Sequence, residues 1–138
     1  MKVLVTGAAG MLGRDLLPAL TERDIDAVGV DLDRADITVP EAVESLLREE
    51  CPQLVIHAAA WTDGERAERE PDSAYRVNAL GARNVAAACA RAGARMILIS
   101  TDYVFDGTKA GPYVESDVPR PLSAYGRGKL EGELLARQ

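Results

Sequence analysis

Residues 2–13 read KVLVTGAAGMLG, a short apolar run that leads into three glycines spaced three residues apart. The run KVLVT is typical of a buried strand, and the leucines that follow at helical spacing indicate a helix. Gly7, Gly10 and Gly13 permit a tight turn, a close approach of backbone to a pyrophosphate, and close packing of the helix on the strand. Because a helix N-terminus attracts anions, this stretch predicts a dinucleotide-binding turn.

The same alternation of strand and helix continues along the chain. Three further apolar, β-rich runs lie at residues 26–30, 53–57 and 95–100. Apolar residues at helical spacing cover residues 12–20, 43–47 and about 72–91. Pro52 and Gly93 stand where two of these helices are expected to end. Near-continuous apolar strands separated by helices predict an α/β fold, a Rossmann-type doubly wound parallel sheet.

Length and composition predict one soluble domain. The 138 residues are 47% hydrophobic and 28% charged, which is ordinary for a globular protein with a real core. The net charge of −6 argues against a nucleic-acid surface. No apolar run is long enough to span a bilayer, and the glycine turn comes too early for a signal peptide, so we expect a cytoplasmic protein. Cys51 and Cys89 lack metal-ligand spacing; we interpret both as reduced packing residues and expect no metal site.

An acidic residue, Asp31, ends the second predicted strand. A carboxylate at this place accepts hydrogen bonds from an adenosine ribose, which favours NADH. Arg34 follows closely and is able to pair with a 2′-phosphate, which favours NADPH. A solvated loop containing Asp31 and Arg34 is the structural alternative, so the residues leave the choice of cofactor open.

Tyr125 and Lys129 lie one helical turn apart, within reach of each other on one face. One charge at about 4 Å, with an effective dielectric of about 20, contributes about 4 kcal/mol. The ammonium therefore favours the phenolate and makes the phenol a better acid–base catalyst near neutrality. Ser100 and Thr101 follow a predicted strand, where ligands of open α/β sheets bind. The Gly- and Pro-rich residues 102–124 predict a long functional loop.

Taken together, these features resemble the dTDP-4-dehydrorhamnose reductase family of extended short-chain dehydrogenases/reductases. The resemblance runs along the whole chain in the phrases TGAAGMLGRDL, HAAAWT, STDYVFDGTKAGPYVESD and PLSAYGRGKLEGE. STDYVFDG is much more specific than a tyrosine and a lysine four residues apart. Family members carry a further substrate domain after this point. The resemblance therefore implies that residues 1–138 are a partial NAD(P)-binding Rossmann domain, truncated before that C-terminal domain.

The resemblance also implies a role for each matching residue. Cofactor contacts are expected from the glycine turn and from the segments that follow the second and third strands: Gly7, Gly10, Met11, Leu12, Gly13, Asp31, Asp36, Ile37, Ala60, Trp61 and Thr62. Thr101 and Asp102 would face the sugar nucleotide, and Thr101, Tyr125 and Lys129 would be catalytic.

The implied reaction is hydride transfer from NADPH or NADH to C4 of a dTDP-4-keto-6-deoxy sugar, which yields dTDP-rhamnose. Tyr125 would protonate the new hydroxyl, while Lys129 would hold the nicotinamide ribose. The implied partner is the dTDP-sugar, with no nucleic acid and no membrane. An isolated half also exposes a sheet edge, which favours association, for example as a homodimer.

Three single residues, and the segment DGER at residues 63–66, depart from the family's usual pattern. His57 replaces an asparagine, and we interpret it as a packed residue at a strand end. Trp61 replaces a smaller aromatic residue or histidine, and stacking near the nicotinamide and capping the core are equally compatible with it. Gly128 replaces a serine or threonine and weakens its helix slightly.

Two other functions remain open. The first is an epimerase or dehydratase of the same superfamily, which the STDYVFDG phrase disfavours. The second is a non-catalytic regulatory homologue, which the intact residues Thr101, Tyr125 and Lys129 disfavour.

Overall fold

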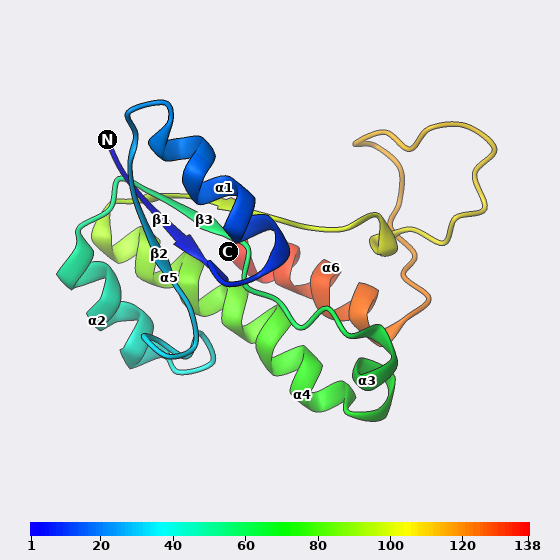
Figure 1. Cartoon of the computed structure of the whole chain (residues 1–138). Coiled ribbons are helices and arrows are strands. Elements are labelled where there is room, and N and C mark those ends of the chain that lie inside the picture. The colour runs from blue at the N-terminus through cyan, green and yellow to red at the C-terminus, as the bar shows by residue number, and fades with distance from the viewer.

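A computed structural model describes all of residues 1–138 and contains a four-stranded parallel sheet with helices on both faces (Figure 1). The strands are β1 (Lys2–Thr6), β2 (Asp26–Val30), β3 (Leu54–His57) and β4 (Arg95–Leu98). Their order across the sheet is β2-β1-β3-β4, and all three pairs are parallel. The sequence therefore predicted the sheet correctly, with the fourth strand ending two residues earlier than expected.

The helices fill the intervals between the strands. They are α1 (Met11–Thr21), α2 (Pro40–Glu50), α3 (Gly64–Arg69), α4 (Pro71–Tyr75), a π-helical segment η1 (Arg76–Gly81), α5 (Ala82–Ala92), a 3₁₀ turn η2 (Asp102–Val104) and α6 (Ala124–Ala136). The elements α4, η1 and α5 follow one another without a break, as the helical pattern at 72–91 predicts. The sequence analysis missed α3, which begins where the Asp63 side chain accepts a hydrogen bond from the backbone N–H of Arg66 at 2.9 Å.

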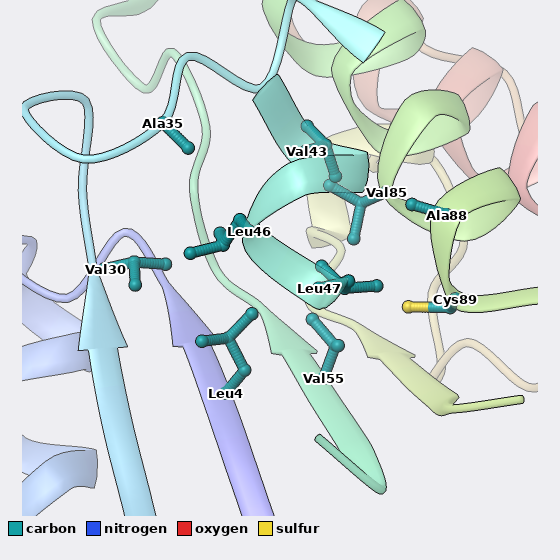
Figure 2. Close-up of a cluster of buried hydrophobic side chains, with 10 residues drawn as sticks. All are labelled: Leu4, Val30, Ala35, Val43, Leu46, Leu47, Val55, Val85, Ala88 and Cys89. Carbon is teal, nitrogen blue, oxygen red and sulfur yellow. The ribbon is translucent and has the colours of Figure 1, made fainter. Parts of the chain in front are cut away.

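The core divides between the two faces of the sheet because side chains alternate along a strand. On one face, Leu4 and Val55 meet apolar residues of α2 and α5 (Figure 2). On the other, Val3 and Val5 pack against the leucines of α1. Helix α6 lies beside α4, η1 and α5 (Figure 1).

The two cysteines have different environments. Both are free, and Cys89 is buried in the core, where burial raises the pKa of its thiol to about 11. Cys51 is exposed, so the prediction that it is a packing residue was wrong. It caps the C-terminus of α2 in a left-handed conformation, with φ of 47°, and its side chain therefore leaves the helix stripe that the core uses.

The segment between η2 and α6 is irregular, as predicted, and projects from the rest of the molecule (Figure 1). Asp106 organises it by accepting hydrogen bonds from the backbone and hydroxyl of Thr108 at 3.0 and 2.8 Å, and from the hydroxyl of Tyr113 at 3.2 Å. The Tyr113 ring stacks on Phe105, with centroids 4.1 Å apart. Its own side chains thus hold the loop.

None of the helices has the length and apolar character needed to cross a membrane.

Candidate active site

The glycine turn joins β1 to α1 in a space that only glycine fits. Gly7 has a φ of 72°, and a Cβ on it would lie 2.7 Å from backbone atoms of Ala59, just after β3. Gly10 caps α1 without a side-chain hydrogen bond, so the first N–H groups of this 11-residue helix have no side-chain acceptor. The first residues of α1 therefore present free backbone donors at the helix N-terminus, the arrangement that binds phosphate.

Asp31 ties the end of β2 to the glycine turn. Its carboxylate accepts hydrogen bonds from the backbone N–H of Ala9 at 2.8 Å and of Leu32 at 2.9 Å. Arg34 points elsewhere: its guanidinium pairs with Glu50 at 2.5 Å and with Glu49 at 3.1 Å, at the end of α2. The structure thus separates two side chains that the sequence placed near the same cofactor end.

A cavity of about 640 Å³ lies at the C-terminal ends of the strands. Its lining combines the glycine turn, the end of β2, the segments that follow β2 and β3, Ile99 and Ser100 after β4, and one face of α6. Twelve of the predicted site residues line it: Gly7, Gly10, Met11, Leu12, Gly13, Asp31, Asp36, Ile37, Ala60, Thr62, Tyr125 and Lys129. Trp61, Thr101 and Asp102 do not.

Lys129 is almost fully buried, with 4% of its surface exposed. Its ammonium donates a hydrogen bond to the backbone carbonyl of Ile99 at 2.6 Å. Burial lowers the pKa of this ammonium, and the charge of Glu133 partly opposes the effect. Tyr125, one turn earlier on α6, is half-buried and packs edge-on against Tyr103 with centroids 5.8 Å apart. The two residues therefore reach the same cavity from one helix face, as their spacing predicts.

Thr101 and Asp102 form a local turn beside this cavity. The Thr101 hydroxyl accepts a hydrogen bond from the backbone N–H of Tyr103 and donates one to Asp102, each at 3.2 Å. This bonding caps η2. The Thr101 hydroxyl, which the resemblance implies is catalytic, is therefore engaged within its own turn, and its neighbour Ser100 lines the cavity.

Asn78 is a residue of this region that the sequence analysis missed. It is buried, and its side-chain amide both accepts from the backbone N–H of Trp61 at 2.8 Å and donates to the backbone carbonyl of Trp61 at 3.0 Å. Its own backbone carbonyl sits so close to Gly132 of α6 that no Cβ would fit there. Asn78 therefore fixes both the segment after β3 and the helix that carries Tyr125. A polar asparagine within an apolar helix pattern was the signal available in the sequence.

The profile of one protein family, described as the RmlD substrate binding domain, matches residues 1–138. The chain belongs to this family. It is 42% identical over 135 residues to the dTDP-4-dehydrorhamnose reductase of Aggregatibacter actinomycetemcomitans, which covers 97% of the chain and 46% of that relative. It is also 40% identical over 139 aligned positions to methionine adenosyltransferase 2 subunit beta of Rattus norvegicus, covering 96% of the chain and 41% of that protein.

Solved structures of the RmlD family share the fold closely. The dTDP-4-dehydrorhamnose reductase of Bacillus anthracis, solved in complex with NADP, superposes with a TM-score of 0.95 at 41% identity. The match covers 99% of this chain and 48% of that one. The RmlD chain described here thus spans about half the length of the relatives it matches.

Trp61 of this RmlD chain is half-buried and packs against a small hydrophobic cluster. Its ring packs with Tyr125 against a small cluster of alanines from α3, α4 and α6, and the Arg66 guanidinium lies 4.5 Å from the ring centroid. The indole N–H is buried without a hydrogen-bond partner. Of the two interpretations left open by the sequence, this placement corresponds to capping the core.

His57 is buried at the end of β3, as the sequence analysis expected. It is 1% exposed, and its Nδ1 shares a hydrogen bond of 2.7 Å with the hydroxyl of Thr6. Burial, aided by the positive charge of Lys129, lowers the pKa of the imidazole from 6.5 to about 3. His57 is therefore neutral at physiological pH and serves as a hydrogen-bonded packing group in the RmlD chain.

This buried imidazole predicts a loss of stability in acid. The unfolded chain takes up the His57 proton below about pH 6.5 and the folded chain only near pH 3, so protonation favours unfolding throughout this window. Between pH 6.5 and pH 5 the free energy of unfolding should fall by about 1.6 kcal/mol through this residue alone. Urea denaturation of the wild type and His57→Asn at both pH values isolates the effect, because other groups cancel in the difference. Equal pH dependence in the two proteins would contradict the prediction.

Proposed function

We propose that residues 1–138 form the NAD(P)-binding domain of a dTDP-4-dehydrorhamnose reductase. One observation carries the proposal: a single cavity is lined by the glycine turn, by Asp31 and by the pair Tyr125 and Lys129. These parts come from opposite ends of the chain, and a nicotinamide dinucleotide is long enough to touch all of them. The reductases among the relatives, one of them solved with NADP, support the same assignment.

The residues present fit such a cofactor. Gly7 leaves room beside Ala59 that a Cβ would fill, and the uncapped start of α1 offers donors to a pyrophosphate. Asp31 would accept the ribose hydroxyls at the adenosine end, with Asp36 and Ile37 near the adenine. Ala60 and Thr62 line the cavity on the way to Lys129, which would hold the nicotinamide ribose. Bound NADH or NADPH would supply the hydride.

The chain's own residues would handle the proton. Tyr125 would donate its phenolic proton to the oxygen of the C4 carbonyl, so that the reduced sugar leaves with a hydroxyl group. The ammonium of Lys129, buried beside it, would stabilise the phenolate that remains. Thr101 and Asp102 do not line the cavity, and the Thr101 hydroxyl is engaged in hydrogen bonds within its own turn. They would therefore contact the sugar nucleotide beside the cavity.

The substrate, location and assembly follow from the same assignment. The substrate class is a dTDP-4-keto-6-deoxy sugar, which matches the names of the reductases at 42% identity or more. A cytoplasmic location remains a prediction from the sequence. A homodimer remains a prediction; the free edge of β4, where Ile97 is 48% exposed, supports it.

A regulatory role is the second candidate function. The match to methionine adenosyltransferase 2 subunit beta favours it, because that name describes a subunit of a different enzyme. A regulatory homologue would keep the cofactor cavity and would not need Tyr125 to transfer a proton.

Cofactor binding is the first test. Fluorescence titration with NADH and with NADPH, on a chain shown by circular dichroism to be folded, should give saturable binding. The tighter ligand decides between the Asp31 and Arg34 interpretations. Addition of a dTDP-4-keto-6-deoxy sugar to a protein that carries this domain together with its substrate domain should then oxidise the bound cofactor. Binding without oxidation would favour the regulatory candidate, and a folded chain that binds neither nucleotide would contradict both.

A further inference from the structure

Glu133 is an acidic residue near the cavity that the proposed function does not use. It lies on α6 one turn beyond Lys129, so both side chains emerge from the same helix face. Its carboxylate accepts a hydrogen bond from the hydroxyl of Ser100, which lines the cavity. Only 22% of the Glu133 side chain is exposed.

Two consecutive residues after β4 hold two residues of α6. The backbone carbonyl of Ile99 binds the ammonium of Lys129 at 2.6 Å, and the hydroxyl of Ser100 binds the carboxylate of Glu133. Both bonds join the end of the sheet to the same helix turn. Together they fix where the ammonium and the carboxylate lie relative to each other, although the two groups form no direct ion pair within 4 Å.

The other charged and titratable groups near Lys129 do not supply a negative charge. His57, from β3, is neutral because burial lowers the pKa of its imidazole to about 3. Arg137 lies 3.8 Å from Glu133 with 76% of its side chain exposed, and is therefore well screened. Burial lowers the pKa of Lys129, and Glu133 is the group whose charge raises it again.

We propose that Glu133, held by Ser100, is a positioning residue that keeps the ammonium of Lys129 charged and in place at the cavity. Without this carboxylate the buried ammonium has one neutral acceptor, the Ile99 carbonyl, to offset its loss of water. The inference rests on the proposed function in one respect, the role of Lys129. In that role Lys129 would need its charge to hold a ribose and to stabilise a phenolate.

Lysine titration by nuclear magnetic resonance tests the role of Glu133 without any cofactor. The chain has three lysines, Lys2, Lys109 and Lys129, so ¹³C-labelled lysine gives three side-chain signals, and loss of one in Lys129→Met assigns it. In Glu133→Gln, the titration midpoint of Lys129 should fall by about one pH unit, the effect of one partly screened charge. Glu131→Gln makes the same charge change on the same helix and should leave this midpoint unchanged.

A second variant covers the case in which Glu133→Gln fails to fold. Ser100→Ala keeps the carboxylate but releases it toward Arg137, so the midpoint of Lys129 should fall by a smaller amount. A Lys129 midpoint equal to that of the wild type in every variant that folds would overturn the proposal. NADH and NADPH titrations of the same wild-type sample keep the two ideas apart, because failure to bind either nucleotide contradicts the proposed function while the lysine titration still decides the role of Glu133.

Discussion

Gly7→Ala is expected to weaken NADH or NADPH binding by about 100-fold, or by nearly 3 kcal/mol. The added methyl group would lie 2.7 Å from the backbone of Ala59, so the turn and the segment after β3 must move apart. Alanine also pays about 1 kcal/mol to keep the left-handed φ of 72°. Both changes displace the free N–H groups at the start of α1 from the phosphates. Fluorescence titration of the folded variant measures the loss.

Gly107→Ala is the matched control for this variant. Gly107 has a φ of 74°, nearly that of Gly7, but a Cβ there meets nothing within 4 Å. The control should therefore lose about 1 kcal/mol of stability from backbone strain and keep its cofactor affinity. If Gly7→Ala binds the cofactor as tightly as Gly107→Ala does, the close approach of the turn to Ala59 has no part in binding.

Tyr125→Phe should lower the turnover of the 4-keto sugar by about 1,000-fold, within the usual contribution of general acid catalysis. The substitution removes the proton donor and leaves a ring of the same shape packed against Tyr103 and the alanine cluster. Cofactor affinity and stability should therefore change little. Steady-state oxidation of NADH or NADPH, with binding measured separately, separates the loss of chemistry from a loss of binding.

Tyr75→Phe provides the control for the loss of a phenol. Tyr75 is 39% exposed at the end of α4, and its hydroxyl makes no hydrogen bond within the chain. Its turnover should match that of the wild type. Full turnover by Tyr125→Phe would show that another group delivers the proton, and no turnover by the wild type would direct attention to the regulatory candidate.

The order of strands and helices along the chain, and hence a parallel sheet, were predictable because they depend on local periodicity. The run KVLVT is nearly continuous in apolar residues, as expected of a strand that is buried on both faces. The structure confirms all four parallel strands. The gathering of the glycine turn, Asp31, Tyr125 and Lys129 was predictable for a related reason. Parallel strands bring their C-terminal ends to one edge, so residues after each strand share a cavity wherever they fall in the sequence.

The partners of individual polar side chains were not predictable, because they lie far away along the chain. Arg34 sits three residues from Asp31, yet it pairs with Glu50, which only the packing of α2 brings near. In the sequence, Asn78 is one polar residue in a helix pattern. Its two hydrogen bonds to Trp61 form only when the fold places η1 beside the segment after β3.

The sequence by itself determined the strands, the turn and the helix face that joins Tyr125 to Lys129, since spacing and backbone sterics act within a few residues. The tertiary structure decided which charges are exposed, neutralised or buried. His57 stays neutral because the fold buries it, and Lys129 loses its water and gains the Ile99 carbonyl because α6 packs against the end of β4. Electrostatic free energies depend on distance and solvent access in space, and neither can be read from spacing along the chain.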